Sequence, residues 1–129
     1  MPPSGTARVL VVEDESVVAL SLADVLQDEG FAVIGPVSSQ AEALTVLEET
    51  RPDVVILDLG LRDGFCAHLA KKLHRRGVPF VVFSGYRQDH TRAEFRDAPW
   101  IEKPGTIAAI LAGIATAMNA GGSVAKART

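Results

Sequence analysis

The sequence has few of the features that mark disulfide-rich, membrane or exported proteins. It contains one cysteine, Cys66, which excludes an internal disulfide and a cysteine-based zinc site. Its longest stretch without a charge, residues 104–125, is interrupted by glycines, and no basic segment followed by a long apolar core opens the chain. We therefore expect neither a membrane span nor a signal peptide, and we interpret the protein as cytoplasmic.

The sequence also lacks the excess of basic residues that is typical of nucleic-acid-binding domains, because its net charge is −3. The charges are unevenly distributed, with a balance of −9 over residues 1–64 and +6 over residues 65–129. No P-loop and no GxGxxG motif follows an expected strand, so nucleotide binding has no support. A divalent cation, if one binds, should find its ligands in the acidic half.

What the sequence does contain is the pattern of one α/β domain. A length of 129 residues suits a single domain, and 47% hydrophobic with 22% charged residues is ordinary globular composition. We expect a core of about residues 8–120 between mobile tails at 1–6 and 121–129. Short, valine-rich apolar runs predict buried parallel strands, with weaker signals for the second and fifth, at residues 9–12, 31–34, 54–57, 80–83 and 99–102.

Helical patterns lie between these strands. The first helix is expected over Ser16–Glu29 before Gly30, the second after a cap at Ser38 or Ser39, and the third over Phe65–Arg76. A short or irregular helix is expected at residues 88–98. The last helix has a predicted core stripe of Ile107, Leu111, Ile114 and Met118. Alternating strands and helices predict a doubly wound α/β sandwich, in which ligands bind beyond the carboxyl ends of the strands.

Polar groups stand at the carboxyl ends of four expected strands. They are Glu13, Asp14 and Glu15 after the first strand, Asp58 after the third, Ser84 and Gly85 at the fourth, and Lys103 at the fifth. Clustered carboxylates suit Mg²⁺, and a carboxylate can attack phosphorus to form an acyl phosphate. Gly60 and Gly85 would let phosphate oxygens approach the backbone closely. The strand ends therefore predict phosphoryl chemistry.

Four motifs resemble the receiver domain of two-component response regulators: VLVVEDE at 9–15, VVILDLGLRDG at 54–64, VVFSGY at 81–86 and EKP at 102–104. The resemblance covers about residues 8–120. It implies a flavodoxin-like three-layer sandwich with a five-stranded parallel sheet in the order 2-1-3-4-5. It also implies a signalling protein that accepts a phosphoryl group from a histidine kinase or a phosphotransfer protein, and catalyses only its own phosphorylation and dephosphorylation.

The same resemblance implies roles for the residues at the reacting centre. Asp58 would be the phosphoacceptor, Ser84 the hydroxyl that meets the phosphoryl group, and Lys103 the amine that pairs with it. Trp100 falls where the family has its switch aromatic. We expect a cis peptide bond between Lys103 and Pro104, which aims the lysine at the phosphate.

The resemblance further implies a magnesium site. Asp14 would be a direct Mg²⁺ ligand, and Glu13 would act mainly through water. Asp58 and the backbone carbonyl of Gly60 would complete the protein's share of the ion shell. Asp14→Ala should accordingly weaken Mg²⁺ binding more than Glu13→Ala.

The sequence departs from the family pattern in two loops. Arg62 stands where receivers commonly have proline, and the chain from Ser84 to Lys103 is short. Both features resemble a subgroup of stand-alone bacterial receivers, some of which carry a Phe-Ala-Thr-Gly motif that FSGY at 83–86 matches in part. The chain is interpreted either as a single-domain regulator or as the receiver of a hybrid kinase.

Two other functions fit the residues less well. A hydrolase of the haloacid dehalogenase type needs a second aspartate two residues after the first, and Gly60 occupies that position. A pseudo-receiver that only binds partners would be expected to lack the acceptor, the acid pair or the lysine, all of which are present.

Two surfaces are candidates for partner binding. Leu20 lies opposite the expected core stripe of the first helix, which suggests docking of the kinase, although single exposed leucines are common. The outer face of the last helix, including Ala109 and Ala112, carries no charge. Alanine's helix propensity explains such a face equally well, but we expect it to mediate self-association, with the fifth strand, or effector binding.

Overall fold

The structure, a computed structural model, describes residues 6–61, 64–85, 95 and 97–128. Its elements are, in chain order, β1 (Arg8–Val12), α1 (Ser16–Asp28), β2 (Ala32–Val37), α2 (Gln40–Glu49), β3 (Val54–Leu57), β4 (Gly60–Leu61), β5 (Gly64–Phe65), α3 (Ala67–Arg76), β6 (Phe80–Ser84), β7 (Trp100–Glu102) and α4 (Ile107–Arg128).

The main sheet has five parallel strands in the order β2-β1-β3-β6-β7, which confirms the predicted order and all five predicted strands. β3 is buried along its whole length, as an unbroken apolar run predicts. β1 and β3 are in register up to Val12 and Leu57, and the backbone N–H of Asp58 donates to the carbonyl of Val12 at 3.0 Å. The first residues after β1 and β3 are therefore neighbours in space.

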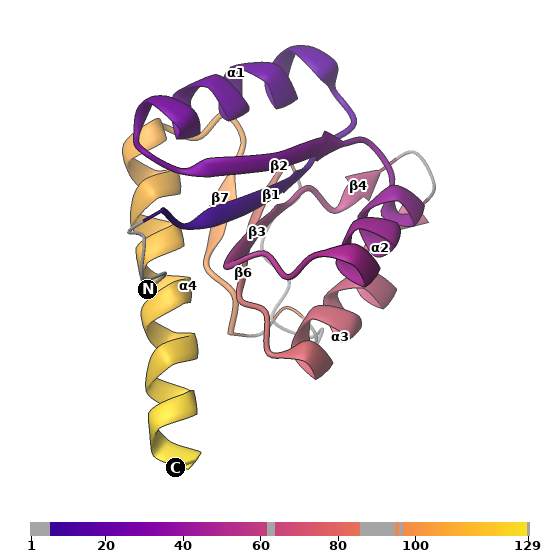
Figure 1. The fold of residues 1–129 in the computed structure, drawn as a ribbon. Coiled ribbons are helices and arrows are strands. Elements are labelled where there is room, and N and C mark those ends of the chain that lie inside the picture. Colours follow the sequence, from indigo (N-terminus) through magenta and orange to yellow (C-terminus); the bar gives the residue numbers. More distant parts are fainter. Residues whose placement is uncertain (1–5, 62–63, 86–94, 96, 129) are drawn as a thin grey trace.

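Two helical layers cover the sheet, as the predicted three-layer sandwich requires. α2 and α3 form one layer on one side of the sheet (Figure 1). α1 and α4 supply the layer that packs on the other side. Apolar residues of α2 and α3, such as Leu47, Leu69 and Leu73, pack with one face of the strands. Leu26 of α1 and Ile114 of α4 pack with the other face. The three inner strands β1, β3 and β6 are thus buried on both sides.

The helix ends follow the sequence signals. Ser39 caps α2, since its Oγ accepts a hydrogen bond from the backbone N–H of Glu42 at 3.1 Å. Gly30, with φ of 98°, follows the end of α1, and Gly77, with φ of 67°, ends α3. Both glycines adopt a left-handed conformation that side chains disfavour, which explains why these helices stop at those points.

The start of the third helix was predicted wrongly. Phe65 lies in β5, which pairs with β4 as a two-stranded antiparallel ribbon, and α3 begins only at Ala67. Glycines at both 60 and 64 disfavour helix here, and the pairing satisfies backbone groups that a bare loop would leave open. The loop after Asp58 is therefore held by its own ribbon.

The rotation of the last helix also differs from the prediction. Ile107 is 38% exposed instead of lying in the core, whereas Ile110 and Ala117 are buried beside Ile114. The helix turns Gly113 toward the sheet, where an added Cβ would lie 2.9 Å from Cδ1 of Ile101. The absent side chain at this position permits the close approach and sets the buried face, while Leu111 and Met118 are partly buried as predicted.

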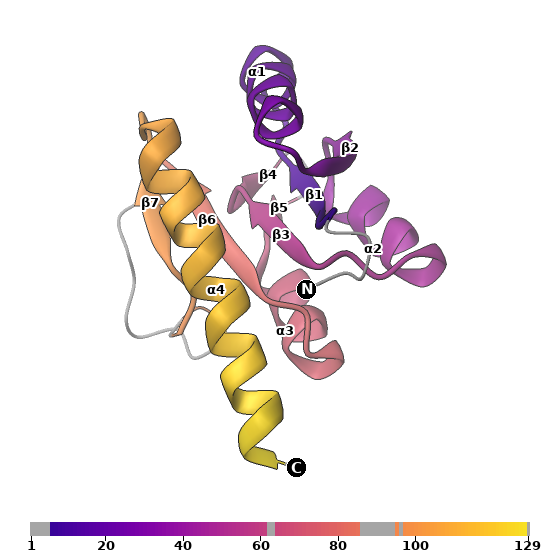
Figure 2. The same ribbon diagram turned by 60° about the vertical axis from the view of Figure 1, so that its left-hand side comes forward.

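α4 extends further than expected, because the predicted tail from residue 121 continues the helix to Arg128. Alanine-rich sequence favours helix, and a glycine weakens a helix by about 1 kcal/mol without ending it. Figure 2 shows the end of α4 reaching past the sheet. The helix expected at residues 88–98 lies mostly outside the described residues. No described helix has the length and apolar character that a membrane crossing needs.

Candidate functional site

Three carboxylates meet where β1 and β3 end. One oxygen from each of Glu13, Asp14 and Asp58 lies within 4.8 Å of the others, as the positions of these residues after aligned parallel strands predict. Glu13 is only 3% exposed and Asp58 only 7%. Carboxylates this close and this buried repel one another, so the cluster requires positive charge. We call these three residues the acid cluster.

Lys103 supplies positive charge to the acid cluster in this structure. Its Nζ lies 2.5 Å from Oε1 of Glu13 and 3.4 Å from Oδ2 of Asp58. The backbone N–H of Lys103 donates to the carbonyl of Ser84 at 2.8 Å, which extends the ladder between β6 and β7 and directs the lysine to this edge. The peptide bond between Lys103 and Pro104 is cis, as predicted.

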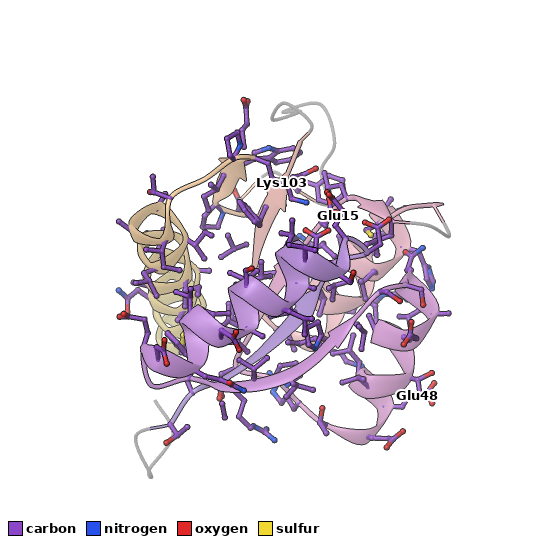
Figure 3. The ribbon with its side chains drawn as sticks, turned by 90° about the horizontal axis from the view of Figure 1, so that it is seen from above. Glu15, Glu48 and Lys103 are labelled. Atoms are coloured by element: carbon purple, nitrogen blue, oxygen red, sulfur yellow. The ribbon has the colours of Figure 1, made fainter. Side chains whose placement is uncertain are left out.

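Glu15 is a third partner of Lys103, with its Oε1 3.6 Å from Nζ. Figure 3 shows the two side chains next to each other where α1 begins. The sequence places Glu15 at this strand end but indicates no role for it. The only indication in the sequence is that Glu15 is the last of three consecutive acids after β1. Its contact with Lys103 depends on where the end of β7 places the lysine.

The charges and the burial of this site shift two pKa values. Burial raises the pKa of the Glu13 carboxyl above its ordinary 4.5, although hydrogen bonds from Lys103 and from the backbone of Glu15 oppose that rise. Burial alone would lower the pKa of Lys103. The hydrogen bond to Glu13 and the negative charges of Asp58 and Glu13 outweigh it and raise the pKa above 10.5.

Asp58 is held by groups from the loop that follows it. The backbone N–H of Gly60 points to Oδ1 of Asp58 at 3.4 Å, and Sγ of Cys66 donates to the backbone carbonyl of Asp58 at 3.3 Å. Cys66 is fully buried. β3, the β4–β5 ribbon and the residue before α3 therefore all help to fix the position of Asp58.

The other predicted site residues lie around the acid cluster. Ser84 is fully buried at the end of β6, and Gly85, directly after it, is exposed. The Nζ of Lys103 lies 5.5 Å from the ring centre of Phe83, one residue before Ser84. The carboxyl ends of β1, β3, β6 and β7 thus contribute to one place, as a parallel sheet dictates.

A divalent cation of the Mg²⁺ type fits the donors of the acid cluster. All three side chains offer oxygen, which Mg²⁺ prefers, and their ligand atoms are close enough to share one ion. The partly buried ammonium of Lys103 between Glu13 and Asp58 shows that this place already attracts positive charge. A carboxylate beside such a cation can act as a nucleophile toward phosphorus, because the positive charge offsets the repulsion of an incoming phosphate.

Trp100 is the first residue of β7, three positions before Lys103. Its ring meets the ring of Phe95 edge to face, with centres 6.1 Å apart and an interplanar angle of 89°. Phe95 is buried in the core on the side of α2 and α3, and Trp100 is partly buried against the same core. The indole thus links β7 to the segment that precedes it.

The candidate partner surfaces are exposed to different degrees. Leu20 is 61% exposed on α1, as predicted, and Val17, for which the sequence predicts no role, is 77% exposed one turn earlier. On α4, Ala112 is exposed and Ala109 is half-buried, so the predicted outer face is only partly open. Leu20 and Val17 thus expose apolar side chains on α1, the helix that begins two residues after Asp14 of the acid cluster.

Comparisons with known proteins agree with this geometry. The family model described as response regulator receiver domain matches residues 9–114. Transcriptional regulatory protein PdtaR of Mycobacterium tuberculosis is 32% identical over 117 residues, which are 87% of this chain and 57% of PdtaR. Transcriptional regulatory protein PrrA of the same organism is 33% identical over 123 residues, which are 92% of this chain and 52% of PrrA. The chain spans about half the length of these relatives.

Solved structures show the same architecture. SdrG from Sphingomonas melonis Fr1 matches with a TM-score of 0.75 and 33% identity, over 88% of this chain and 97% of SdrG. A CheY-like receiver domain protein from Methanospirillum hungatei JF-1 has a TM-score of 0.81 at 22% identity, over 92% of this chain and 98% of that protein. The second likeness supports the fold alone.

Proposed function

The chain belongs to the response regulator receiver domain family of two-component systems, and we propose that it accepts a phosphoryl group on Asp58 in a Mg²⁺-dependent reaction. The observation that carries the proposal is the acid cluster with Lys103, in which Nζ lies 3.4 Å from Oδ2 of Asp58. Of the three residues of the acid cluster, Asp58 is the one that follows the central strand β3. Lys103, which follows β7, extends to it. A nucleophile, a place for a cation and an amine therefore share one edge of the sheet.

We assign the ion as the resemblance implies. Asp14 would bind Mg²⁺ directly, Glu13 mainly through water, and Asp58 and the carbonyl of Gly60 would complete the protein ligands. When bound, Mg²⁺ supplies charge neutralisation for the phosphoryl oxygens. The oxygen-only donor set of the acid cluster supports this assignment.

The transfer step uses groups of this chain around Asp58. A carboxylate oxygen of Asp58 attacks phosphorus of a phosphohistidine, the new O–P bond forms as the N–P bond breaks, and the electron pair stays on the imidazole nitrogen. The ammonium of Lys103 and the backbone N–H groups of Gly60 and Gly85 would meet the phosphoryl oxygens. Their contribution is positioning and charge, which is most of what phosphoryl transfer requires.

Ser84 and Trp100 would pass the change to a surface. In this proposal the Ser84 hydroxyl binds the phosphoryl group, and Trp100 repacks against its neighbours in response. A local change of charge would thereby bias a two-state surface made by β7 and α4. The edge-to-face contact between Trp100 and the buried Phe95 supports a coupling of this kind, because moving the indole must alter that packing.

Two partner classes follow from the proposal. A histidine kinase or a phosphotransfer protein would dock on α1, where Leu20 and Val17 expose apolar surface and which begins two residues after Asp14. A second copy of the chain, or an effector, would contact α4 around Ala109 and Ala112 together with β7. We place this exchange in the cytoplasm and assign no direct contact with nucleic acid or membrane.

The receiver would turn over its own acyl phosphate and no external substrate. The direct test of phosphorylation at Asp58 is to measure the intact mass of the wild type and of Asp58→Asn after incubation with Mg²⁺ and a small acyl phosphate. Gain of one phosphoryl group by the wild type alone supports the proposal. A wild-type protein that gains none under these conditions would instead be a pseudo-receiver that acts only by binding partners.

A further inference from the structure

Among the described residues, three carboxylates contact Lys103, and they are not equivalent. Glu13 and Asp58 are buried and belong to the acid cluster, whose oxygens converge on one place. Glu15 does not belong to the acid cluster, its side chain is 66% exposed, and it reaches the same ammonium at 3.6 Å. Lys103 is therefore paired with buried carboxylates on one side and with a solvent-facing carboxylate on the other.

The backbone fixes the place of Glu15. Its N–H donates to Oε2 of Glu13 at 3.0 Å, so Glu13 uses one oxygen for this amide and the other for Lys103. Glu15 is also the N-cap residue of α1, directly before Ser16, and its side chain makes no capping hydrogen bond there. The carboxylate of Glu15 is thus free of the usual helix-start role and is directed to Lys103 (Figure 3).

We propose that Glu15 is a positioning residue that holds the Lys103 ammonium at the open side of the acid cluster. The inference rests on the proposed function, in which the oxygens of Glu13 and Asp58 are taken up by a cation and a phosphoryl group. Once they are, Glu15 is the one of the three observed partners that Lys103 keeps unchanged. It keeps the ammonium near the place where phosphorus arrives, while the exposed pair remains weak enough to rearrange.

Positioning and simple charge predict opposite effects. Replacing Glu15 with glutamine removes a negative charge near an incoming anionic phosphodonor, which by itself should speed the reaction. Loss of a partner for Lys103 should slow it, by roughly two- to fivefold for an ion pair this exposed. The sign of the change therefore separates the two explanations.

The first test observes Lys103 itself. The side-chain ammonium signal is recorded by ¹H–¹⁵N NMR with and without Mg²⁺, and is identified as the one absent from Lys103→Arg. In the Mg²⁺-loaded protein we expect Glu15→Gln to shift this signal and to speed the exchange of its protons with water. The matched control is Glu48→Gln, which removes one exposed glutamate on α2, far from Lys103 in Figure 3. A signal in Glu15→Gln that matches both wild type and control would overturn the inference.

The second test measures phosphorylation by a small acyl phosphate at saturating Mg²⁺. Glu15→Gln is expected to react about two- to fivefold more slowly than wild type, and Glu48→Gln at the wild-type rate. In a Lys103→Met background, Glu15→Gln should no longer slow the reaction, because the group that it positions is gone. A faster Glu15→Gln, or equal slowing in both backgrounds, would contradict a positioning role.

The two proposals can fail separately. A wild-type protein that gains no phosphoryl group overturns the proposed function, and the ammonium signal then still decides whether Glu15 holds Lys103. A wild type that is phosphorylated normally, with Glu15→Gln equal to Glu48→Gln in both measurements, overturns the role of Glu15 alone.

Discussion

The ammonium of Lys103 lies 2.5 Å from the carboxylate of Glu13, although the two residues are 90 positions apart in the sequence. Glu13 directly follows β1 and Lys103 directly follows β7, so the parallel sheet brings them together at its carboxyl edge. This pairing stabilises the buried acid. A bound cation would compete with Lys103 for Glu13, and a phosphate would compete with Glu13 for Lys103.

The raised pKa of Glu13 gives the metal-free protein a specific pH dependence. A group whose pKa is raised on folding stabilises the fold below its unfolded pKa, and this contribution is lost as the pH rises through the folded pKa. The unfolded pKa is about 4.5, so the loss should begin near that pH and continue above it. Denaturant unfolding in the presence of a chelator, at a series of pH values, measures this change.

Glu13→Gln is the control for that dependence, because glutamine does not titrate. As the pH rises from 4.5, the free energy of unfolding of the wild type should fall relative to that of Glu13→Gln. A constant difference over that range would show that burial does not raise the pKa of Glu13.

The fold was predictable because its strands are short, apolar and separated by helical patterns. The runs at Val9–Val12 and Val54–Leu57 became β1 and β3, and the acids after them meet because parallel strands end at the same edge. The meeting of Asp58 with Lys103 follows from the same rule. The acid cluster could therefore be located from the sequence, although the roles of its members rest on the family resemblance.

Other features depend on tertiary contacts that no local pattern contains. The β4–β5 ribbon has two residues in each strand, too few for a periodic signal. In α4, apolar or small residues occur on several faces, so periodicity alone does not choose between Ile107 and Ile110 for the core. The close approach of Gly113 to Ile101 makes that choice, and it requires knowledge of the packed sheet.

Trp100 should report the switch by its fluorescence, because it is the one tryptophan in the chain. Phosphorylation is expected to change its emission as the contact with Phe95 repacks. The change should be absent in Asp58→Asn and reduced in Ser84→Ala, which keeps the acceptor but lacks the hydroxyl. Emission that stays constant while the wild type becomes phosphorylated would remove Trp100 from the switch.

Leu20→Asp should slow phosphoryl transfer from a phosphorylated histidine kinase by about tenfold, the equivalent of roughly 1.4 kcal/mol at an interface. The reason is that Leu20 exposes apolar surface on α1, the helix that begins two residues after Asp14. Phosphorylation by a small acyl phosphate needs no docking and should be unchanged. Equal slowing with both donors would indicate damage to the fold rather than to docking.

Ala112→Arg should reduce phosphorylation-dependent self-association without altering phosphorylation of Asp58. Ala112 is exposed on α4, and a long charged side chain there would hinder close approach of a second helix. Sedimentation velocity with and without phosphodonor measures the association. An unchanged monomer for both proteins under both conditions would exclude the dimer and leave an effector as the partner of this face.

Intact mass spectrometry decides whether Asp58 accepts the phosphoryl group with the help of Mg²⁺. Wild type, Asp58→Asn and the matched surface control Asp24→Asn are each incubated with a small acyl phosphate, with Mg²⁺ or with a chelator. We expect one added phosphoryl group on wild type and Asp24→Asn with Mg²⁺, and none on any protein with chelator or on Asp58→Asn. The same gain on Asp58→Asn as on wild type would contradict it.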